Sequence, residues 1–323
     1  MNNSGFKKNL LSGIAGLVLV MGLSVFFQAC PRRSEIAHNE KNKTSAARPV
    51  LALSILPQTW FAQRLAGERV RTLVLVGPGQ NPHSYEPTPA QMKDLAQADA
   101  WVLSGTEFEI SLMPKIQKLF PGLVIIDGTD GVVFRMLDAD EAHNDDEYSD
   151  GEYGIDRHTW LGLAPAKILA SHIRDALVLI DPEGKNFFED NYTAMSGEID
   201  EEFSILRTEL APLAGSSVYV YHPGFGYLLD EFEIYQKAVE SGGKEPGPRE
   251  LAGLVSNMKQ ERASAIFIQA QYPVNAARTL AQAAGAQLIS LDPLSADWLG
   301  NIRIMGNALK SAAQASGGTS SEQ

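Results

Sequence analysis

Apolar and polar positions alternate regularly from Val50 onward, with short apolar runs separated by longer amphipathic segments. This alternation is typical of parallel β-sheets whose strands are joined by helical crossovers. The expected strands are 50–55, 70–76, 100–103, 123–126, 218–221, 265–268, 288–291 and, with the weakest pattern, 234–239. The expected helices are 57–65, 89–98, 109–120, 165–180, 248–260, 274–283 and 296–309. The pattern predicts an α/β fold with two lobes, each a mostly parallel sheet flanked by helices.

The segment 183–211, between the two groups of strands, has no strand character. Its apolar residues recur at spacings of three and four, which predicts one long helix that ends before Pro212. We expect this helix to link an N-terminal lobe at 49–182 to a C-terminal lobe at 212–312. The residues that follow, 313–323, are rich in Ser and Gly, and we expect them to form a disordered tail.

Residues 1–29 have the character of a secretory signal peptide. A short basic region with Lys7 and Lys8 precedes an uncharged, mostly apolar run that ends at the small residue Ala29. The only cysteine, Cys30, follows directly, which resembles a bacterial lipoprotein signal, in which this residue is lipidated and becomes the first mature residue. Ordinary cleavage after Ala29 and an uncleaved membrane anchor are the alternatives. All three place the rest of the chain outside the cytoplasm, either in a periplasm or at the cell surface.

Charge and cysteine content narrow the chemistry. The chain of 323 residues carries 27 Lys and Arg against 39 Asp and Glu, which argues against nucleic acid as a partner. A single Cys excludes zinc sites built from several thiolates, so a metal site must use His and carboxylates. The polar stretch 30–48 is expected to be a flexible tether. The segment 138–153 is predicted to be an acidic loop, with eight acidic residues, no Lys or Arg, and His143.

Four candidate ligands lie in the loops of the predicted lobes. His83 comes after the strand 70–76, and His222 and Asp292 directly follow two later strands. His158 lies just after the acidic loop. Ligands of open parallel sheets bind outside the carboxyl ends of the strands, so a cleft between the lobes would bring these groups together. Three imidazoles and one carboxylate suit zinc, although each residue taken alone is better explained as a polar group that caps a loop by hydrogen bonding.

The segments around these residues resemble, in the same order, those of a known family. The similar segments are Gly77–Pro89, Asp156–Leu161, Tyr221–Tyr227 and Leu291–Leu294. They resemble the zinc/manganese solute-binding proteins of bacterial ABC importers (cluster A-I, ZnuA/TroA-like). This resemblance extends from Val50 to Leu309. It implies two α/β lobes bridged by a rigid helix, and a metal site in the inter-lobe cleft whose ligands are His83, His158, His222 and Asp292.

Three positions depart from the pattern of this family. His222 stands where manganese-preferring relatives typically have Glu, and nitrogen-rich ligation favours Zn²⁺ over Mn²⁺. Gln269 stands where relatives often have Glu. The loop 138–153 is acidic, whereas zinc-binding relatives often have a His-rich loop there. The expected bound ion is therefore Zn²⁺, with Mn²⁺ or Fe²⁺ as the alternatives.

The resemblance implies a non-enzymatic role. We expect a monomer, attached to the membrane through lipidated Cys30, that captures Zn²⁺ and delivers it to an ABC permease and its ATPase subunit. A zinc hydrolase is the main alternative from another class, with Glu86 as its candidate base. Catalytic zinc keeps three protein ligands and an open position, whereas Asp292 would close this site. A surface adhesin, a role reported for some members of the family, is a third possibility, but the sequence offers no separate adhesion module.

Overall fold

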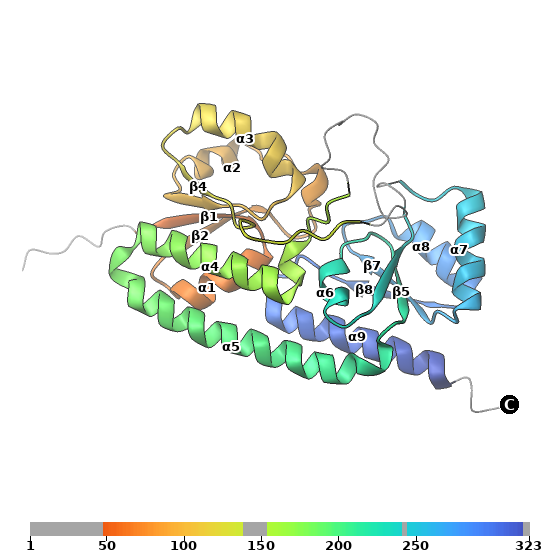
Figure 1. The fold of residues 1–323 in the computed structure, drawn as a ribbon. Coiled ribbons are helices and arrows are strands. Elements are labelled where there is room, and N and C mark those ends of the chain that lie inside the picture. Colours follow the sequence, from red (N-terminus) through yellow and green to blue (C-terminus); the bar gives the residue numbers. More distant parts are fainter. Residues whose placement is uncertain (1–47, 138–153, 241–243, 319–323) are drawn as a thin grey trace, which may run out of the picture. The chain divides into compact units, whose positions relative to one another are not determined.

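The computed structural model describes residues 48–137, 154–240 and 244–318, and within them the chain forms two sheets of four parallel strands (Figure 1). The first sheet has the order β2-β1-β3-β4, and the second has the order β6-β5-β7-β8. The strands are β1 (Val50–Ile55), β2 (Arg71–Val76), β3 (Ala100–Val102), β4 (Val124–Ile126), β5 (Ser217–Val220), β6 (Tyr235–Ala238), β7 (Ala265–Gln269) and β8 (Gln287–Leu291). The α/β prediction with two parallel sheets is confirmed. The predicted signal peptide, Cys30 and the acidic loop 138–153 lie outside the described residues.

The burial of the inner strands explains the continuous apolar runs by which they were predicted from the sequence. In β1 every residue from Leu51 to Ile55 is buried, and in β7 all five residues are buried. Continuous apolar runs are typical of parallel strands that are covered on both faces. Parallel pairing also brings the carboxyl ends of the strands to one edge of each sheet, as in the pairs Ile55–Val76 and Gln269–Leu291.

Helices cover both faces of each sheet. They are α1 (Pro57–Ala66), α2 (Pro89–Leu95), α3 (Glu107–Leu119), α4 (Leu163–Ile180), α5 (Lys185–Leu210), α6 (Gly226–Asp230), α7 (Pro248–Gln260), α8 (Val274–Ala284) and α9 (Trp298–Gly318). Two differ from the prediction. The short helix α6 was not predicted, because five residues are too few to show a helical period. Residues 313–318 belong to α9 rather than to a disordered tail, in keeping with the helix-forming Ala313 and Ala315.

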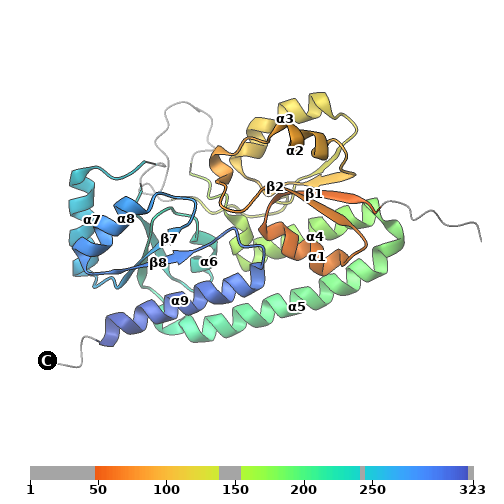
Figure 2. The same cartoon turned by 180° about the vertical axis from the view of Figure 1, so that it is seen from behind.

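The long helix α5 links the two lobes, as predicted. Its 26 residues correspond to a length of about 39 Å at about 1.5 Å per residue. Figures 1 and 2 show α5 running from the first sheet to the second, with α9 along its second half. It also contacts α1 and α4. Phe188, Ile199 and Phe203 are among its fully buried side chains, so the inner face of α5 belongs to the main core.

Tryptophan side chains join the lobes close to the carboxyl ends of the strands. Trp298 of α9 packs on Phe61 of α1, with ring centroids 4.8 Å apart. Its indole N–H donates to the carbonyl of Trp160 at 2.7 Å, and the indole N–H of Trp160 donates to the carbonyl of Pro293 at 2.8 Å. Both indoles are buried. The described residues of both lobes, between 48 and 318, fall within one compact unit.

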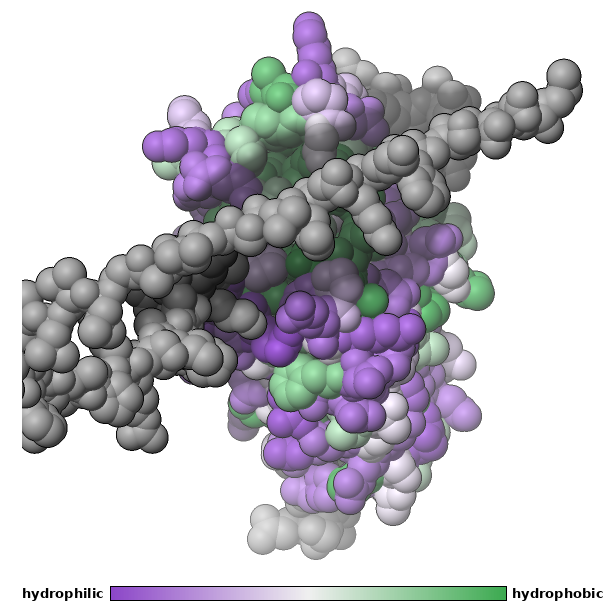
Figure 3. All heavy atoms as spheres, turned by 90° about the vertical axis from the view of Figure 1, so that its left-hand side faces the viewer, coloured by the Kyte–Doolittle hydropathy of each residue, from purple (hydrophilic) through white to green (hydrophobic). Residues whose placement is uncertain are grey.

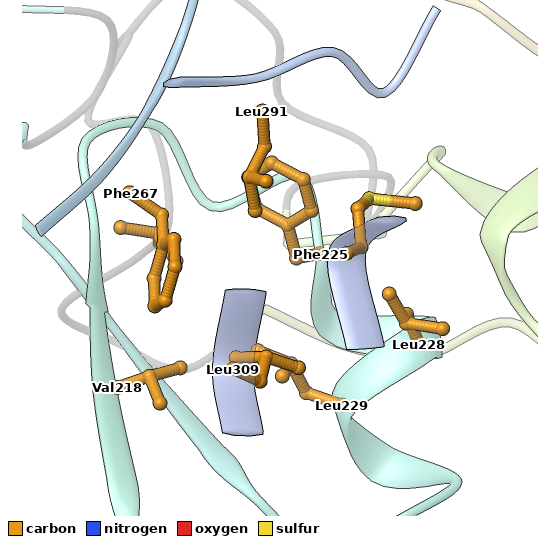
Figure 4. Close-up of a pocket in the computed structure, with 9 residues that line it drawn as sticks. Val218, Phe225, Leu228, Leu229, Phe267, Leu291 and Leu309 are labelled. Carbon is orange, nitrogen blue, oxygen red and sulfur yellow. The ribbon is translucent and has the colours of Figure 1, made fainter. Parts of the chain in front are cut away.

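The second lobe contains a narrow apolar gap between its sheet, α6 and α9. Figure 4 shows that the surrounding side chains, among them Phe225, Phe267 and Leu309, point toward one another. All of the residues that line the gap are apolar, so it offers no group that would bind an ion.

On the face drawn in Figure 3, the part below the grey trace is mostly hydrophilic, with a few separate apolar side chains. None of the helices in the described part of the chain is long and apolar enough to span a membrane.

Candidate metal centre

Three histidine rings converge beyond the carboxyl ends of the strands. One ring nitrogen from each of His83, His158 and His222 lies within 4.8 Å of the other two. Nε2 of His222 is 3.1 Å from Nε2 of His83 and 3.3 Å from Nε2 of His158. Two nitrogens bound to one zinc ion at about 2.0–2.1 Å in tetrahedral geometry would be about 3.3–3.4 Å apart. The rings therefore have the spacing of ligands of one divalent cation.

His83 lies in the loop that follows β2. Asn81 begins a short 3-10 turn there, and its side-chain oxygen accepts a hydrogen bond from the backbone N–H of His83 at 3.0 Å. The ring Nδ1 of His83 is 3.0 Å from Oε2 of Glu107, the first residue of α3. The His83 side chain is 24% exposed, whereas those of His158 and His222 are 10% and 4% exposed. Solvent therefore reaches the centre from the His83 side.

His158 is held by Asp156, two residues earlier. Oδ1 of Asp156 accepts hydrogen bonds from the backbone N–H of His158 at 3.0 Å and from its ring Nδ1 at 2.9 Å. The Asp156 side chain is completely buried. These two bonds fix both the backbone and the ring of His158, so its Nε2 is directed to the other two rings.

His222 comes two residues after β5. The partner of its ring, Glu240, comes two residues after β6, the strand that pairs with β5. The ring Nδ1 of His222 is 2.5 Å from Oε1 of the buried Glu240. Glu240 is held opposite by its backbone N–H, which donates to the carbonyl of Tyr221 at 3.0 Å. The ring of Tyr272 stacks on that of His222, with centroids 4.5 Å apart. The neutral Gln269 donates through its side chain to the His222 carbonyl at 2.9 Å, so it positions the backbone.

All three rings thus present the same nitrogen to the centre. Each Nδ1 faces a carboxylate, so in the neutral rings Nδ1 carries the proton and Nε2 keeps its lone pair for a metal ion. Carboxylate–histidine pairs of this kind orient metal ligands and raise their basicity. Together these three contacts prepare the inner nitrogens of the rings to bind a metal ion.

The carboxylates also control the protons of the centre. Burial lowers the pKa of His83, but the hydrogen bond and the charge of Glu107 outweigh it and leave this pKa raised. Burial opposes ionisation of Glu107, yet His83 brings the pKa of Glu107 down to about 2. Burial raises the pKa of Glu240 to about 7. Both raised pKa values favour the protonated forms of His83 and Glu240, so a cation bound to Nε2 of His83 would compete with a proton.

Asp292 lies at the edge of this centre, outside the group of three rings. It is exposed, and its Oδ1 accepts hydrogen bonds from the backbone N–H of Leu294 at 3.0 Å and from Nε2 of Gln271 at 3.2 Å. It follows β8, which is separated from β5 by β7. Strands are about 4.8 Å apart, so this order places the end of β8 about 10 Å from that of β5. The role of Asp292 as a metal ligand stays a prediction.

The hollow over the rings is lined by residues of both lobes. These include Asn81, Trp160, Gln271, Tyr272 and Leu294, together with the three histidines. Among the described residues, the buried side-chain oxygen of Gln271 has no hydrogen-bond partner. Amide and imidazole groups therefore line the hollow together with the apolar Trp160, Pro293 and Leu294.

Neither Glu107 nor Glu240 was predicted from the sequence, and Asp156 was named only as the first residue of the segment Asp156–Leu161. A signal was present, because Glu107 and Glu240 each follow a strand of the same sheets that carry the ligands. Acidic residues at the carboxyl ends of neighbouring strands are candidates for partners of histidine ligands. Choosing among them requires the order of the strands.

Replacing Glu240 with Gln is expected to weaken Zn²⁺ binding about 10–100-fold, because His222 loses the carboxylate that orients it. Competition with a chelator of known affinity measures this change. Glu86→Gln is the matched control, since Glu86 lies three residues from His83 but is exposed. Unchanged Zn²⁺ affinity in Glu240→Gln would mean that Glu240 does not support the ligand.

Comparisons with known proteins agree with this geometry. The family model described as "ZnuA: Zinc-uptake complex component A periplasmic" matches residues 51–312. The chain is 26% identical over 284 residues to the zinc-binding lipoprotein AdcA of Streptococcus pneumoniae, covering 86% of this chain and 54% of AdcA. It is 24% identical to the manganese ABC transporter substrate-binding lipoprotein PsaA of the same species, over 82% of this chain and 84% of PsaA. The chain therefore spans about half the length of AdcA and most of the length of PsaA.

The fold agrees as well. A crystal structure of ZnuA superimposes with a TM-score of 0.75 at 28% identity, covering 82% of this chain and 99% of that chain. The matching family consists of metal-binding transport proteins and not of enzymes, as the sequence analysis expected. Since the family model covers both lobes and all three histidines, the chain belongs to the family of periplasmic zinc-uptake complex component A.

Proposed function

We propose that this protein is the extracytoplasmic binding component of a metal ABC importer, which captures Zn²⁺ and delivers it to a permease with its ATPase subunit. The observation that carries the proposal is the convergence of three Nε2 atoms, two pairs of them 3.1 and 3.3 Å apart. Membership of the family supports the transport role. The zinc-binding AdcA and the manganese-transporting PsaA both resemble this chain, so the choice of metal depends on the ligands.

The ligand chemistry favours zinc. Three imidazoles form a nitrogen-rich set, and divalent affinities at such sites rise from Mn²⁺ through Fe²⁺ to Zn²⁺. Carboxylate- and water-rich sets suit Mn²⁺ better. The carboxylates Glu107, Asp156 and Glu240 contact the outer nitrogens of the rings, which leaves the inner nitrogens for the ion.

We keep Asp292 as the proposed fourth ligand. Its approach requires the hydrogen bond from Gln271 to open, or the segment around Asp292 to shift toward the rings. Three neutral imidazoles and one carboxylate would leave a bound Zn²⁺ with a formal charge of +1. A closed set of four protein ligands is typical of zinc sites that do not catalyse reactions.

Release would depend on local changes at the ligands. The long helix α5 and the buried Trp160 and Trp298 join the lobes, so wide opening of the cleft is costly. We propose that the permease displaces the more exposed loop of His83 to release the ion. We also propose that Cys30 is lipidated, in which case Cys30→Ser would move the protein from the membrane to the soluble fraction.

Titration of the metal-free protein with Zn²⁺ and Mn²⁺, in competition with a chelator, tests the proposed cargo. We expect one tight Zn²⁺ per chain and Mn²⁺ binding weaker by at least about tenfold. Cells that lack this protein should take up less zinc when zinc is scarce, and excess zinc should restore their growth. Equal or tighter Mn²⁺ binding would overturn zinc as the cargo, and absence of tight binding of either ion would overturn the transport role.

A further inference from the structure

We propose that Arg135 is a positioning residue for the ligand His158, and that it acts by tying the carboxylate of Asp156 to the C-terminal lobe. The inference rests on the proposed function, because it concerns how the same metal centre is held. Arg135 belongs to the segment after β4, and it has no place in the metal-binding motifs of the sequence.

The buried carboxylate of Asp156 lies between His158 and Arg135. Oδ1 of Asp156 binds His158 twice, and its Oδ2 is 3.4 Å from a terminal nitrogen of the Arg135 guanidinium. The Asp156 side chain is 0% exposed and that of Arg135 is 15% exposed. A buried carboxylate requires a cation or several hydrogen bonds to remain ionised, and here Arg135 provides the cation. The guanidinium thus holds the oxygen of Asp156 that His158 does not use.

Arg135 also contacts the helix α6 of the C-terminal lobe. Nε of Arg135 donates to Oδ2 of Asp230, the last residue of α6, at 3.0 Å. In the same helix, the hydroxyl of Tyr227 accepts from the backbone N–H of Arg135 at 2.8 Å and donates to the carbonyl of Asp156 at 3.0 Å. Arg135 and Asp156 are therefore each bound to α6, and His158 is bound to Asp156.

Two glycines, Gly224 and Gly226, lie against these side chains, where a larger residue would have little room. A Cβ on Gly226 would lie 2.5 Å from Nε of Arg135 and 2.7 Å from Oδ2 of Asp156. A Cβ on Gly224 would lie 3.1 Å from Nε2 of His158. Both glycines let the backbone of the C-terminal lobe approach the group that holds His158. The segment 221–227 therefore supplies one ligand, His222, and also receives the residues that position another.

The backbone completes the group. The backbone N–H of Asp156 donates to the carbonyl of Arg135 at 2.9 Å, and Met136 forms an antiparallel bridge with Ile155. Arg135 and Asp156 are thus paired through main chain and side chain alike. Any shift of α6 relative to this pair would be passed to the imidazole of His158.

The test uses the full chain, with Zn²⁺ and Co²⁺ as probes. In Arg135→Ala we expect Zn²⁺ affinity to fall about 10–100-fold, as for other partners of metal ligands. The visible absorption bands of bound Co²⁺, which report ligand geometry, should also change. Arg135→Lys keeps a charge but cannot bind two carboxylates with one planar group, so it should restore only part of the affinity. Tyr227→Phe, which removes one hydroxyl, provides a milder second variant that should shift the same bands.

Arg303→Ala is the matched control. Arg303 pairs with Glu202 between α9 and α5, away from the rings, so its loss should lower thermal stability without changing the Co²⁺ spectrum or the Zn²⁺ affinity. Wild-type Zn²⁺ affinity and Co²⁺ spectrum in both Arg135→Ala and Tyr227→Phe would overturn the inference. Failure of the wild-type protein to bind Zn²⁺ would instead overturn the proposed function, so the two failures are distinguishable.

Discussion

Replacing His222 with Ala should abolish tight Zn²⁺ binding, with a loss greater than the roughly 10–100-fold that removal of a hydrogen-bonding partner causes. His222 lies in the middle of the group, since its Nε2 is the atom near both other rings. The substitution removes one ligand and also leaves Glu240, whose side chain is 2% exposed, without its ring partner. Chelator competition at neutral pH measures the affinity.

His172→Ala is the matched control for this variant. His172 lies on α4, and its ring contacts the carbonyl of Asp130 at 2.9 Å, outside the metal-capable group. It should bind Zn²⁺ as the wild type does. Thermal unfolding of both variants without metal shows whether each is folded. A folded His222→Ala protein with wild-type Zn²⁺ affinity would rule out the site described here.

Zn²⁺ affinity should fall by up to about 100-fold between pH 7.5 and 5.5 for each proton that the ion displaces, because one fully bound proton changes the affinity about tenfold per pH unit. The pKa of His83 is raised, mainly by Glu107 against the effect of burial, and burial raises that of Glu240 to about 7. Glu240 therefore takes up a proton within this window, and the raised pKa of His83 favours its protonated form. Affinities measured at several pH values, corrected for protonation of the chelator, give the number of protons.

The stability of the metal-free protein should follow the opposite trend. Some groups have a higher pKa in the folded than in the unfolded protein. Such a group stabilises the fold fully at pH values below its pKa in the unfolded chain, and this stabilisation is lost as the pH rises through its pKa in the folded protein. For His83 and Glu240 this means greater stability at pH 5.5 than at pH 7.5. Glu107 has a lowered pKa of about 2, so its stabilising effect is lost only when the pH falls below the ordinary pKa of a glutamate, which is outside this window. Zn²⁺ affinity that does not change with pH would contradict the protonated state proposed for the metal-free centre.

The sequence carried the information for the strands and for three imidazoles, but not for their surroundings. Buried runs such as 50–55 and 265–269 are local signals, and the histidines stand in recognisable segments. Glu240 supports His222 only because β6 is next to β5. The order of the strands depends on packing of distant segments, and no local pattern contains it.

For Asp292 the sequence predicted the preceding strand but not the place of that strand in the sheet. Its place directly after a strand made it a candidate ligand, and the strand β8 was predicted correctly. The position of β8 at the edge of the sheet, two strands from β5, leaves Asp292 bound to Gln271 and Leu294. The use of Gly226 for close approach to Arg135 was likewise invisible, because the two residues are far apart in sequence.

X-ray absorption at the zinc edge of the loaded protein tests the central claim most directly. We predict three imidazole nitrogens at about 2.0–2.1 Å and one oxygen at about 2.0–2.2 Å. Weaker Zn²⁺ binding by Asp292→Ala, with the imidazole signals retained, would agree with Asp292 as the fourth ligand. A first shell of oxygens only, or one with fewer than two imidazoles, would contradict a centre built from His83, His158 and His222.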